Sequence, residues 1–337
     1  AGSGSATVAR AAGRQGGPPE RATGVQGSSE RGGAGIEVAG LRREFGRLVA
    51  VDGIDLSIGS GELFSLLGPN GAGKTTTIRM LCCLLRPTGG TARIGGYDIR
   101  DDPIAVKQII AVSPQETAIA EHLDAWENLS LMARLHGLDK AETRRRSGTL
   151  LEMLALSGRA GDRVKKYSGG MKRRLSIAMA LVSHPRVLFL DEPTLGLDPQ
   201  ARRGLWEHID GLKGETTIVL TTHYLEEADA LADRIGVIDE GRIVALGTAA
   251  ELKAAVPGAG VTVVEADLTD GAVEALREVY PSVVRTAAGV EIGGEDVRLD
   301  AIVDALRPLG IEVRSSFRKQ VSLDDVFVHL TGRQLRE

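Results

Sequence analysis

The sequence predicts an α/β fold in which a parallel sheet forms the core, an antiparallel β subdomain precedes it and a helical subdomain is inserted into it. Two short apolar runs, 63–67 and 187–190, have the composition of strands that are buried on both faces of a parallel sheet. The first run leads through a glycine-rich loop into a helix-like pattern that starts at Thr76, and the second ends in two acidic residues. These strands, the loop and the helix define the core on which the other elements are placed.

The composition is that of an ordinary globular protein with room for one large and one smaller domain. Of the 337 residues, 42% are apolar and 26% are charged. Aromatic residues make up only 3% and the formal net charge is −4, so we expect no nucleic-acid partner. No run approaches the roughly 18–20 apolar residues that a membrane helix needs. If the protein works at a membrane, another chain must supply the span.

The first 34 residues differ from the rest of the chain. They are rich in Gly, Ala, Ser and Arg and show no apolar periodicity. Such a composition cannot bury enough surface to offset the cost of ordering, so we expect residues 1–34 to be a disordered Gly/Ala/Arg-rich tail. A signal peptide would need an apolar segment, which this tail lacks.

Residues 35–253 are expected to form the large domain. Alternating apolar positions predict half-buried strands at 36–38 and 54–58, ahead of the buried strand at 63–67. The pattern from 122 to 161 is almost wholly helical and predicts the inserted subdomain. The remaining elements are expected as strands at 91–94 and 109–113, a helix at 172–183, strands at 187–190 and 218–220, and a hairpin over 235–244.

A smaller α+β domain is expected at 261–337, after a linker at 254–260 that contains Pro and Gly. Its predicted order is strand, helix, strand, strand, helix, strand, which indicates a split βαβ arrangement. The chain closes on an amphipathic helix that Ser322 would cap.

The glycine-rich loop fits the phosphate-binding template G-x-x-x-x-G-K-[ST]. Its glycines let successive backbone N–H groups point at one phosphate chain, and the helix that follows adds its positive end. Lys74 is expected to reach the β- and γ-phosphates, and the Thr75 hydroxyl to coordinate Mg²⁺. The alternative, a loop that merely turns the chain, does not explain the strand and helix on either side. We therefore expect ATP to contact Gly68, Asn70, Gly71, Gly73, Lys74, Thr75 and Thr76.

The second buried run ends in Asp191 and Glu192. In nucleotidases with a phosphate loop, a carboxylate in the position of Asp191 holds magnesium, and Glu192 beside it is the candidate to polarise the attacking water. Phosphoryl transfer depends mainly on positioning and charge compensation, so these few groups can suffice. The alternative is a pair of solvated carboxylates at a strand end.

Four more motifs complete a resemblance. They are Gln115, the glycine-containing stretch Tyr167–Met171, the stretch Leu195–Asp198 and His223. Their order and spacing resemble the Q-loop, signature, D-loop and switch histidine in the ATP-binding subunits of ABC transporters. Tyr167 and Met171 depart from the Leu and Gln that are commonest in the signature. The resemblance covers roughly residues 36–250 and implies a P-loop NTPase fold of the ABC type.

The resemblance implies that two copies pair head to tail, most simply as a homodimer. Ser168 and the amides of Gly169 and Gly170, at a helix start, would then bind the γ-phosphate of the ATP held by the other copy. Asp198 lies in the stretch that resembles the D-loop, and the resemblance implies that it also contacts ATP.

Three single residues receive roles in the same way. His223 would hydrogen-bond the γ-phosphate and keep the catalytic water in line, and Gln115 would contact both Mg²⁺ and that water. Phe45 either stacks on adenine or packs in the core, and the sequence does not decide between the two.

The closing stretch Val321–Gly332 resembles the tail of drug-export ATPase subunits of the daunorubicin/doxorubicin-resistance type, and Tyr224–Asp229 is similar to them too. In the alternative, the terminal helix only packs on its own small domain.

The resemblance favours an ATPase that binds ATP and Mg²⁺ and drives a separate membrane permease from the cytoplasmic face of the cell membrane, exporting drugs or lipophilic compounds. The alternative is a soluble ABC-type ATPase that acts on ribosomes or DNA. Such relatives usually carry two cassettes, long coiled coils or zinc modules, and this sequence shows none. A third class, a regulatory module that barely hydrolyses ATP, is disfavoured by the presence of both Glu192 and His223.

Overall fold

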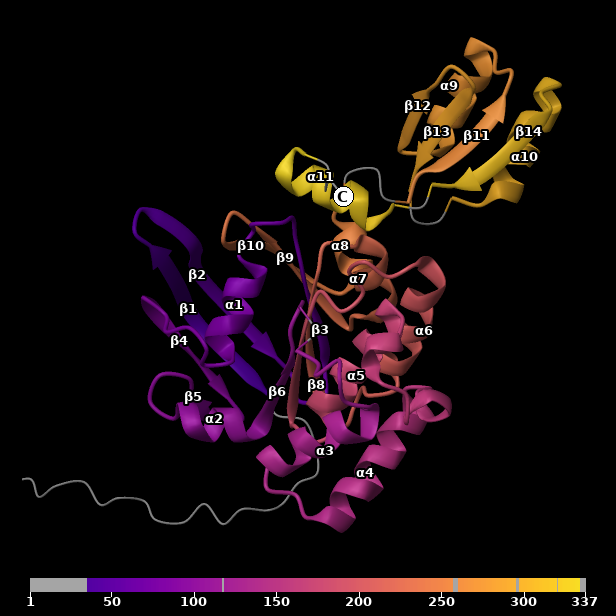
Figure 1. Ribbon diagram of the computed structural model, residues 1–337. Coiled ribbons are helices and arrows are strands. Elements are labelled where there is room, and N and C mark those ends of the chain that lie inside the picture. Colours follow the sequence, from indigo (N-terminus) through magenta and orange to yellow (C-terminus); the bar gives the residue numbers. More distant parts are fainter. Residues whose placement is uncertain (1–34, 117, 257–259, 295–296, 320, 334–337) are drawn as a thin grey trace, which may run out of the picture. The chain divides into compact units, whose positions relative to one another are not determined.

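The computed structural model describes residues 35–116, 118–256, 260–294, 297–319 and 321–333. These residues form three sheets with helices around them, which are labelled in Figure 1. The predicted tail at 1–34 and the middle of the predicted linker, 257–259, lie outside the described residues. No helix in the part that the structure describes is long and apolar enough to cross a membrane.

The predicted antiparallel β subdomain is confirmed as a four-stranded sheet of order β2-β1-β4-β5. Ile36 pairs with Ile58 and Val38 with Leu56, and these four side chains are buried while their neighbours are exposed. This alternation is what the sequence pattern predicts. The strands are β1 (Ile36–Phe45), β2 (Leu48–Ile58), β4 (Gly89–Ile94) and β5 (Tyr97–Asp98).

The core sheet has the order β10-β9-β3-β8-β7-β6, and its five strands from β9 to β6 run parallel. Strand β10 pairs antiparallel with β9 at the edge, as the predicted hairpin requires. Every residue of β3, β7 and β8 is buried, so the apolar runs in the sequence mark the middle of the sheet. The strands are β3 (Leu63–Leu67), β6 (Ile110–Ser113), β7 (Val187–Asp191), β8 (Thr217–Thr222), β9 (Arg234–Asp239) and β10 (Arg242–Gly247).

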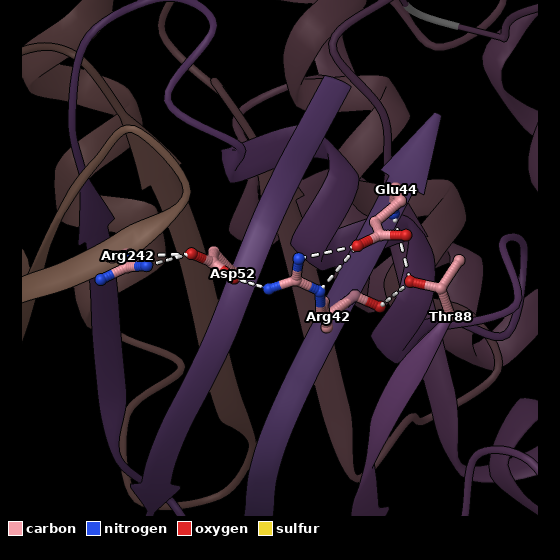
Figure 2. Close-up of polar contacts among 5 residues, drawn as sticks. All are labelled: Arg42, Glu44, Asp52, Thr88 and Arg242. Atoms are coloured by element: carbon pink, nitrogen blue, oxygen red, sulfur yellow. Dashed lines mark hydrogen bonds and ion pairs between the residues drawn. The ribbon is translucent and has the colours of Figure 1, made fainter. Parts of the chain in front are cut away.

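Ionic contacts connect the antiparallel sheet to the edge of the core sheet (Figure 2). The Asp52 carboxylate on β2 accepts from Arg42 on β1 and from Arg242 Nε on β10, the latter at 2.8 Å. Arg42 also donates to Glu44 at 2.7 Å, and Glu44 N donates to Thr88 Oγ1 at 3.2 Å. Asp52 thus holds two guanidinium groups from different sheets at the junction beside the glycine-rich loop.

In the described part of the chain, five helices belong to the core and its edges. The predicted helix after the glycine-rich loop is α1, which buries Ile78, Met80 and Leu81. Two of the others begin with Pro at their first position, where a backbone N–H would have no hydrogen-bond partner within the helix. They are α1 (Lys74–Leu81), α2 (Pro103–Ile109), α6 (Pro199–Asp210), α7 (Leu225–Leu231) and α8 (Ala249–Ala254).

The helical subdomain is confirmed between β6 and β7. Helix α3 starts in a capping box in which Asp124 accepts from Glu127 N, and Glu127 accepts from Asp124 N. Helix α5 begins at Gly169, three residues earlier than predicted, because the Ser168 side chain caps its first turn. The helices are α3 (Ala125–Leu135), α4 (Lys140–Met153), the 3₁₀ turns η1 (Ser157–Arg159) and η2 (Val164–Lys166), and α5 (Gly169–Leu181).

Residues 262–294 and 297–318 contain a third sheet of order β12-β13-β11-β14 with its own apolar cluster. Strands and helices follow in the predicted βαββαβ order. They are β11 (Thr262–Ala266), α9 (Asp270–Val279), β12 (Ser282–Arg285), β13 (Gly289–Gly293), α10 (Leu299–Leu306), the 3₁₀ turn η3 (Arg307–Leu309) and β14 (Val313–Arg318).

The closing helix α11 (Leu323–Thr331) has the predicted Ser322 cap. Its buried residues Leu323, Val326 and Phe327 share one cluster with Ala228 of α7 and Leu252 of α8. The alternative in which this helix packs only on the small domain is therefore wrong. Beyond α11, Arg333 pairs with Asp239 at 2.6 Å and so reaches the turn between β9 and β10.

Candidate nucleotide-binding site

The glycine-rich loop joins β3 to α1 and closes around its own lysine. Lys74 is buried, and its Nζ donates to the carbonyl oxygens of Gly68 at 2.7 Å and Pro69 at 3.1 Å. A Cβ on Gly68 would lie 2.2 Å from Ile238 O, and one on Gly73, where φ is +104°, would lie 2.5 Å from Ala50 O. Only glycine fits at these two positions, which explains the template in steric terms.

Lys74 also faces the acidic pair at the end of β7. Its Nζ lies 3.3 Å from Glu192 Oε1, and both side chains are buried. Burial lowers the pKa of Lys74, and the negative charge of Glu192 works in the opposite direction. A buried ammonium group at the mouth of a glycine-rich loop suits an anionic ligand that would supply further negative charge.

Asp191 lies at the end of β7, next to Thr75 at the start of α1. Thr75 Oγ1 donates to Asp191 Oδ1 at 3.2 Å, and Thr221 Oγ1 donates to the same oxygen at 2.6 Å. A hydroxyl and a carboxylate side by side are hard oxygen donors of the kind that Mg²⁺ prefers, with water and phosphate filling its other positions. The residues present therefore fit a magnesium ion.

Glu192 occupies a left-handed backbone conformation with φ of +46°. Its N–H donates to Thr221 O and to Thr221 Oγ1, both at 3.1 Å, which holds the turn in place. The carboxylate then lies 3.4 Å from His223 Nδ1, at the end of the neighbouring strand β8. A non-glycine residue held in this conformation by its surroundings is typical of a functional site.

These groups open into one pocket of about 800 Å³. It receives side chains from the ends of β3, β7 and β8 and from the turn between β1 and β2. Phe45 is 45% exposed and lines this pocket, so the alternative that places it in the core is wrong. The residues expected from the sequence that line it are Phe45, Asn70, Gly71, Gly73, Lys74, Thr75, Thr76, Gln115, Glu192 and His223.

Of the expected signature and D-loop residues, Leu195 lines this pocket, whereas those predicted to contact ATP line other pockets of the single chain. Ser168, Gly170 and Asp198 line a second pocket of about 280 Å³, and Gly169 lines a third with Gln115. Ser168 Oγ accepts from Met171 N at 3.3 Å, so the amides at the start of α5 are aligned. Asp198 caps α6 by accepting from Gln200 N and Ala201 N.

Among the pocket residues that were not predicted as site residues are Arg202 of α6 and Tyr224, which follows His223. Asp198 followed by Pro199 is a strong helix-start signal, and reading it would have placed Arg202 one turn into a helix beside the site. A third missed residue is Arg173, whose buried guanidinium donates to the carbonyl oxygens of Asp191 and Pro193, both at 2.8 Å. Burial lowers the pKa of Arg173 to about 10, so it remains charged at neutral pH.

Comparison with known proteins identifies the family. The model of the family described as ABC transporter matches residues 51–195. The daunorubicin resistance ATP-binding protein DrrA3 of Streptomyces coeruleorubidus is 43% identical over 306 residues, which make up 89% of this chain and 97% of that protein. The Nod factor export ATP-binding protein I of Paraburkholderia xenovorans is 40% identical, over 90% of this chain and 99% of that protein.

A solved structure gives the same answer for the fold. A dimeric ATP-binding cassette in a post-hydrolysis state, bound to ADP and phosphate, is 27% identical with a TM-score of 0.57, and the match covers 63% of this chain and 98% of that one. The P-loop NTPase fold of the ABC type is thereby confirmed. With the glycine-rich loop, Glu192 and His223 lining one pocket, the chain belongs to the ATP-binding subunits of ABC transporters and is an ATPase.

Proposed function

We propose that this chain hydrolyses ATP in the 800 Å³ pocket to drive a separate membrane permease that exports lipophilic compounds, drugs among them. The observation that carries the proposal is the meeting of Lys74, Glu192 and His223 at the ends of three neighbouring strands. No other described pocket combines a buried ammonium group, a carboxylate and an imidazole.

The triphosphate would lie along the glycine-rich loop. Lys74 would exchange its contacts with Gly68 O and Pro69 O for the β- and γ-phosphates, and the amides at the start of α1 would face the phosphate chain. Phe45 lines the pocket and is 45% exposed, so an adenine ring could stack on it. Thr75, Asp191 and Gln115 would hold Mg²⁺, which supplies charge neutralisation of the phosphates when bound.

Glu192 would polarise the attacking water, and His223 would orient the γ-phosphate. The Glu192 side chain is buried and its backbone is held by hydrogen bonds to Thr221, so the residue needs little reorganisation at the moment of reaction. When the γ-phosphate binds, it would take the place of Glu192 as the partner of Lys74. The Glu192 carboxylate could then accept a hydrogen bond from the attacking water, so ATP binding itself would make the base available.

A second copy of the chain would complete the site. Ser168, Gly170 and Asp198 line their own pocket in the single chain, away from the loop that holds the triphosphate. A head-to-tail pair would place the N-terminus of α5 from one copy over the ATP of the other. The dimeric cassette with ADP and phosphate supports such pairing.

The permease would dock in a groove between α3, α5 and β6. This groove has a volume of about 280 Å³ and is lined by Met132, His136, Met179 and Leu84 among others. Leu84 is 66% exposed, and Leu135, which precedes the lining residue His136 at the end of α3, is 73% exposed. Apolar side chains left in water at the rim of a groove are typical of an interaction surface. The chain would then work at the cytoplasmic face of the membrane, bound to the permease.

The cargo is proposed from the relatives. One is named for daunorubicin resistance at 43% identity and another for Nod factor export at 40%. These names support export, and they do not favour the alternative of a soluble ATPase that acts on ribosomes or DNA. The two relatives are named for different cargoes and are almost equally identical to this chain. We therefore propose that the permease determines which cargo is exported.

The test is affinity purification of the full chain from detergent-solubilised native membranes. We expect a polytopic membrane protein in near-equal amount, and the variants Leu84→Glu and Leu135→Glu should lose it while they still bind ATP. Leu309→Glu is the matched control, because Leu309 is also exposed but lies in the C-terminal sheet domain. Recovery of ribosomes or nucleic acid in place of a membrane protein would overturn the transport proposal and leave the ATPase activity standing.

A further inference from the structure

Helices α6 and α7 pack against each other beside the nucleotide pocket, and two side-chain contacts connect them. Arg202 and Trp206 lie one turn apart on α6, and they contact Tyr224 and Glu227 at the start of α7. The first contact lines the pocket, and the second is part-buried and involves the fully buried Glu227.

The first contact is a stack of three side chains. The Arg202 guanidinium carbon lies 4.0 Å from the centroid of the Tyr224 ring. That ring lies 4.1 Å from the ring of His223, centroid to centroid, with 40° between the planes. A guanidinium over a tyrosine ring is a favourable cation–π arrangement. The order Arg202, Tyr224, His223 therefore leads from α6 directly to the expected switch histidine.

The second contact fixes the distance between the helices. Trp206 Nε1 donates to Glu227 Oε1 at 3.1 Å, and Glu227 is fully buried. Because this bond holds α6 against α7 one turn further on, the guanidinium of Arg202 stays over the ring of Tyr224.

His223 depends on the stack because little else orients it. Its Nδ1 is buried and has no hydrogen-bond partner among the residues that the structure describes. The nearest charged group is Glu192, at 3.4 Å from Nδ1. Rotation about the last side-chain torsion of histidine is soft, so a neighbouring ring that packs against it decides its plane.

We propose that Arg202 is a positioning residue for ATP hydrolysis, which fixes the ring of His223 through its stack on Tyr224. The proposal rests on the role given to His223 in the proposed function. It also links the D-loop to catalysis, since Arg202 lies on the helix that Asp198 caps. Any movement of that helix would change the plane of the histidine ring.

The test compares Arg202→Ala with Arg202→Lys in the full-length chain, assayed together with the membrane subunit that purifies with it. We expect Arg202→Ala to lower kcat for ATP by about 5- to 30-fold, which is the loss of a partly buried cation–π contact expressed as a rate. Arg202 lines the pocket, but its guanidinium lies over the Tyr224 ring, so the KM for ATP should change by less than about twofold. Arg202→Lys keeps a cation over the ring and should restore most of the rate. Arg203→Ala is the matched control, since Arg203 is the next residue and is exposed.

A double mutant separates positioning from mere support of the fold. In single-turnover assays, Arg202→Ala should cause no further loss in a His223→Ala background, because the group that it positions is gone. A full additional loss there, or a loss seen only in KM, would overturn the proposal. If Arg202→Ala does not fold by circular dichroism, Tyr224→Leu against Tyr224→Phe makes the same comparison, and only the leucine should lower kcat. If His223→Ala has the kcat of the native chain, the role proposed for His223 itself is overturned. If His223→Ala lowers kcat but Arg202→Ala does not, only the present inference is overturned.

Discussion

Lys74 Nζ lies 3.3 Å from Glu192 Oε1, so the cation expected to bind the γ-phosphate and the carboxylate expected to activate water are paired with each other. Both side chains are buried, and neither can be removed without leaving the other as an uncompensated charge. Despite this pairing, the effects of the two residues should be separable by experiment, since Lys74 should govern ATP binding and Glu192 turnover.

Glu192→Gln should lower the turnover number by about 10²–10⁴-fold, which is the usual contribution of a positioned base. The glutamine keeps the size of the side chain and loses the charge that holds Lys74, so ATP should bind at least as tightly as to the native chain. Steady-state hydrolysis and the Kd of a fluorescent ATP analogue check the two parts. A variant with near-native hydrolysis would remove Glu192 from the mechanism.

Lys74→Ala should instead weaken ATP binding by about 10- to 100-fold, the range for losing charge-assisted hydrogen bonds to a phosphate. The same fluorescent analogue measures it, with Lys140→Ala as the control, since Lys140 is an exposed lysine of the helical subdomain. An unchanged affinity would contradict the assignment of the loop as the phosphate site.

The binding of ATP should weaken in alkaline solution earlier than an exposed lysine would allow. Burial places the pKa of Lys74 below its ordinary value of 10.5, and only the protonated form binds phosphate, so affinity should start to fall at a pH below 10.5. In Glu192→Gln the carboxylate that raises this pKa is gone, and the fall should move to still lower pH. Titration of the analogue's Kd from neutral pH upward tests both statements.

The stability of the nucleotide-free chain should depend on pH in the opposite direction to the affinity for ATP. Between the lowered pKa of Lys74 and 10.5, the unfolded state binds more protons than the folded state, so the contribution of Lys74 to stability rises with pH. If the affinity for ATP began to fall at the same pH in wild type and in Glu192→Gln, this result would contradict the electrostatic pairing of Lys74 and Glu192.

The sequence predicted the sheet core, the pocket and the closing helix because each rests on a local pattern. Buried strands β3 and β7 read as continuous apolar runs, and the loop between β3 and α1 tolerates only glycine at Gly68 and Gly73. The Ser322 cap of α11 is likewise a local signal.

Contacts between distant segments were not predictable in this way. The packing of Phe327 against Ala228 and Leu252, the position of Arg173 among carbonyl oxygens and the stack of Arg202 on Tyr224 all join residues far apart in the chain. Each depends on how two elements meet in space, which a periodic pattern does not encode. These tertiary contacts hold the site residues in place, whereas the motifs only say which residues they are.

Glu227→Gln should stabilise the chain at pH values above the raised pKa of Glu227. Glu227 is fully buried on α7, and burial raises its pKa above the ordinary value of 4.5, against the opposing effects of hydrogen bonds such as that from Trp206 and of the charge on Arg202. Between 4.5 and this raised value, the folded state holds a proton that the unfolded state has lost. Stability therefore falls as pH rises through that interval, and it is greatest below 4.5.

Glutamine keeps an oxygen for Trp206 Nε1 and cannot ionise, so the variant should lose this pH dependence and gain about 1–3 kcal/mol in the free energy of unfolding above the interval. Urea unfolding from pH 5 to 8 measures it, with Glu226→Gln as the control, because Glu226 is the neighbouring acid and is not buried. A Glu227→Gln variant that is less stable at pH 8 and keeps the native slope would show that the charge of Arg202 more than offsets the burial. Glu227 would then be a stabilising partner of α6, and the contact between α6 and α7 would be electrostatic as well as a matter of packing.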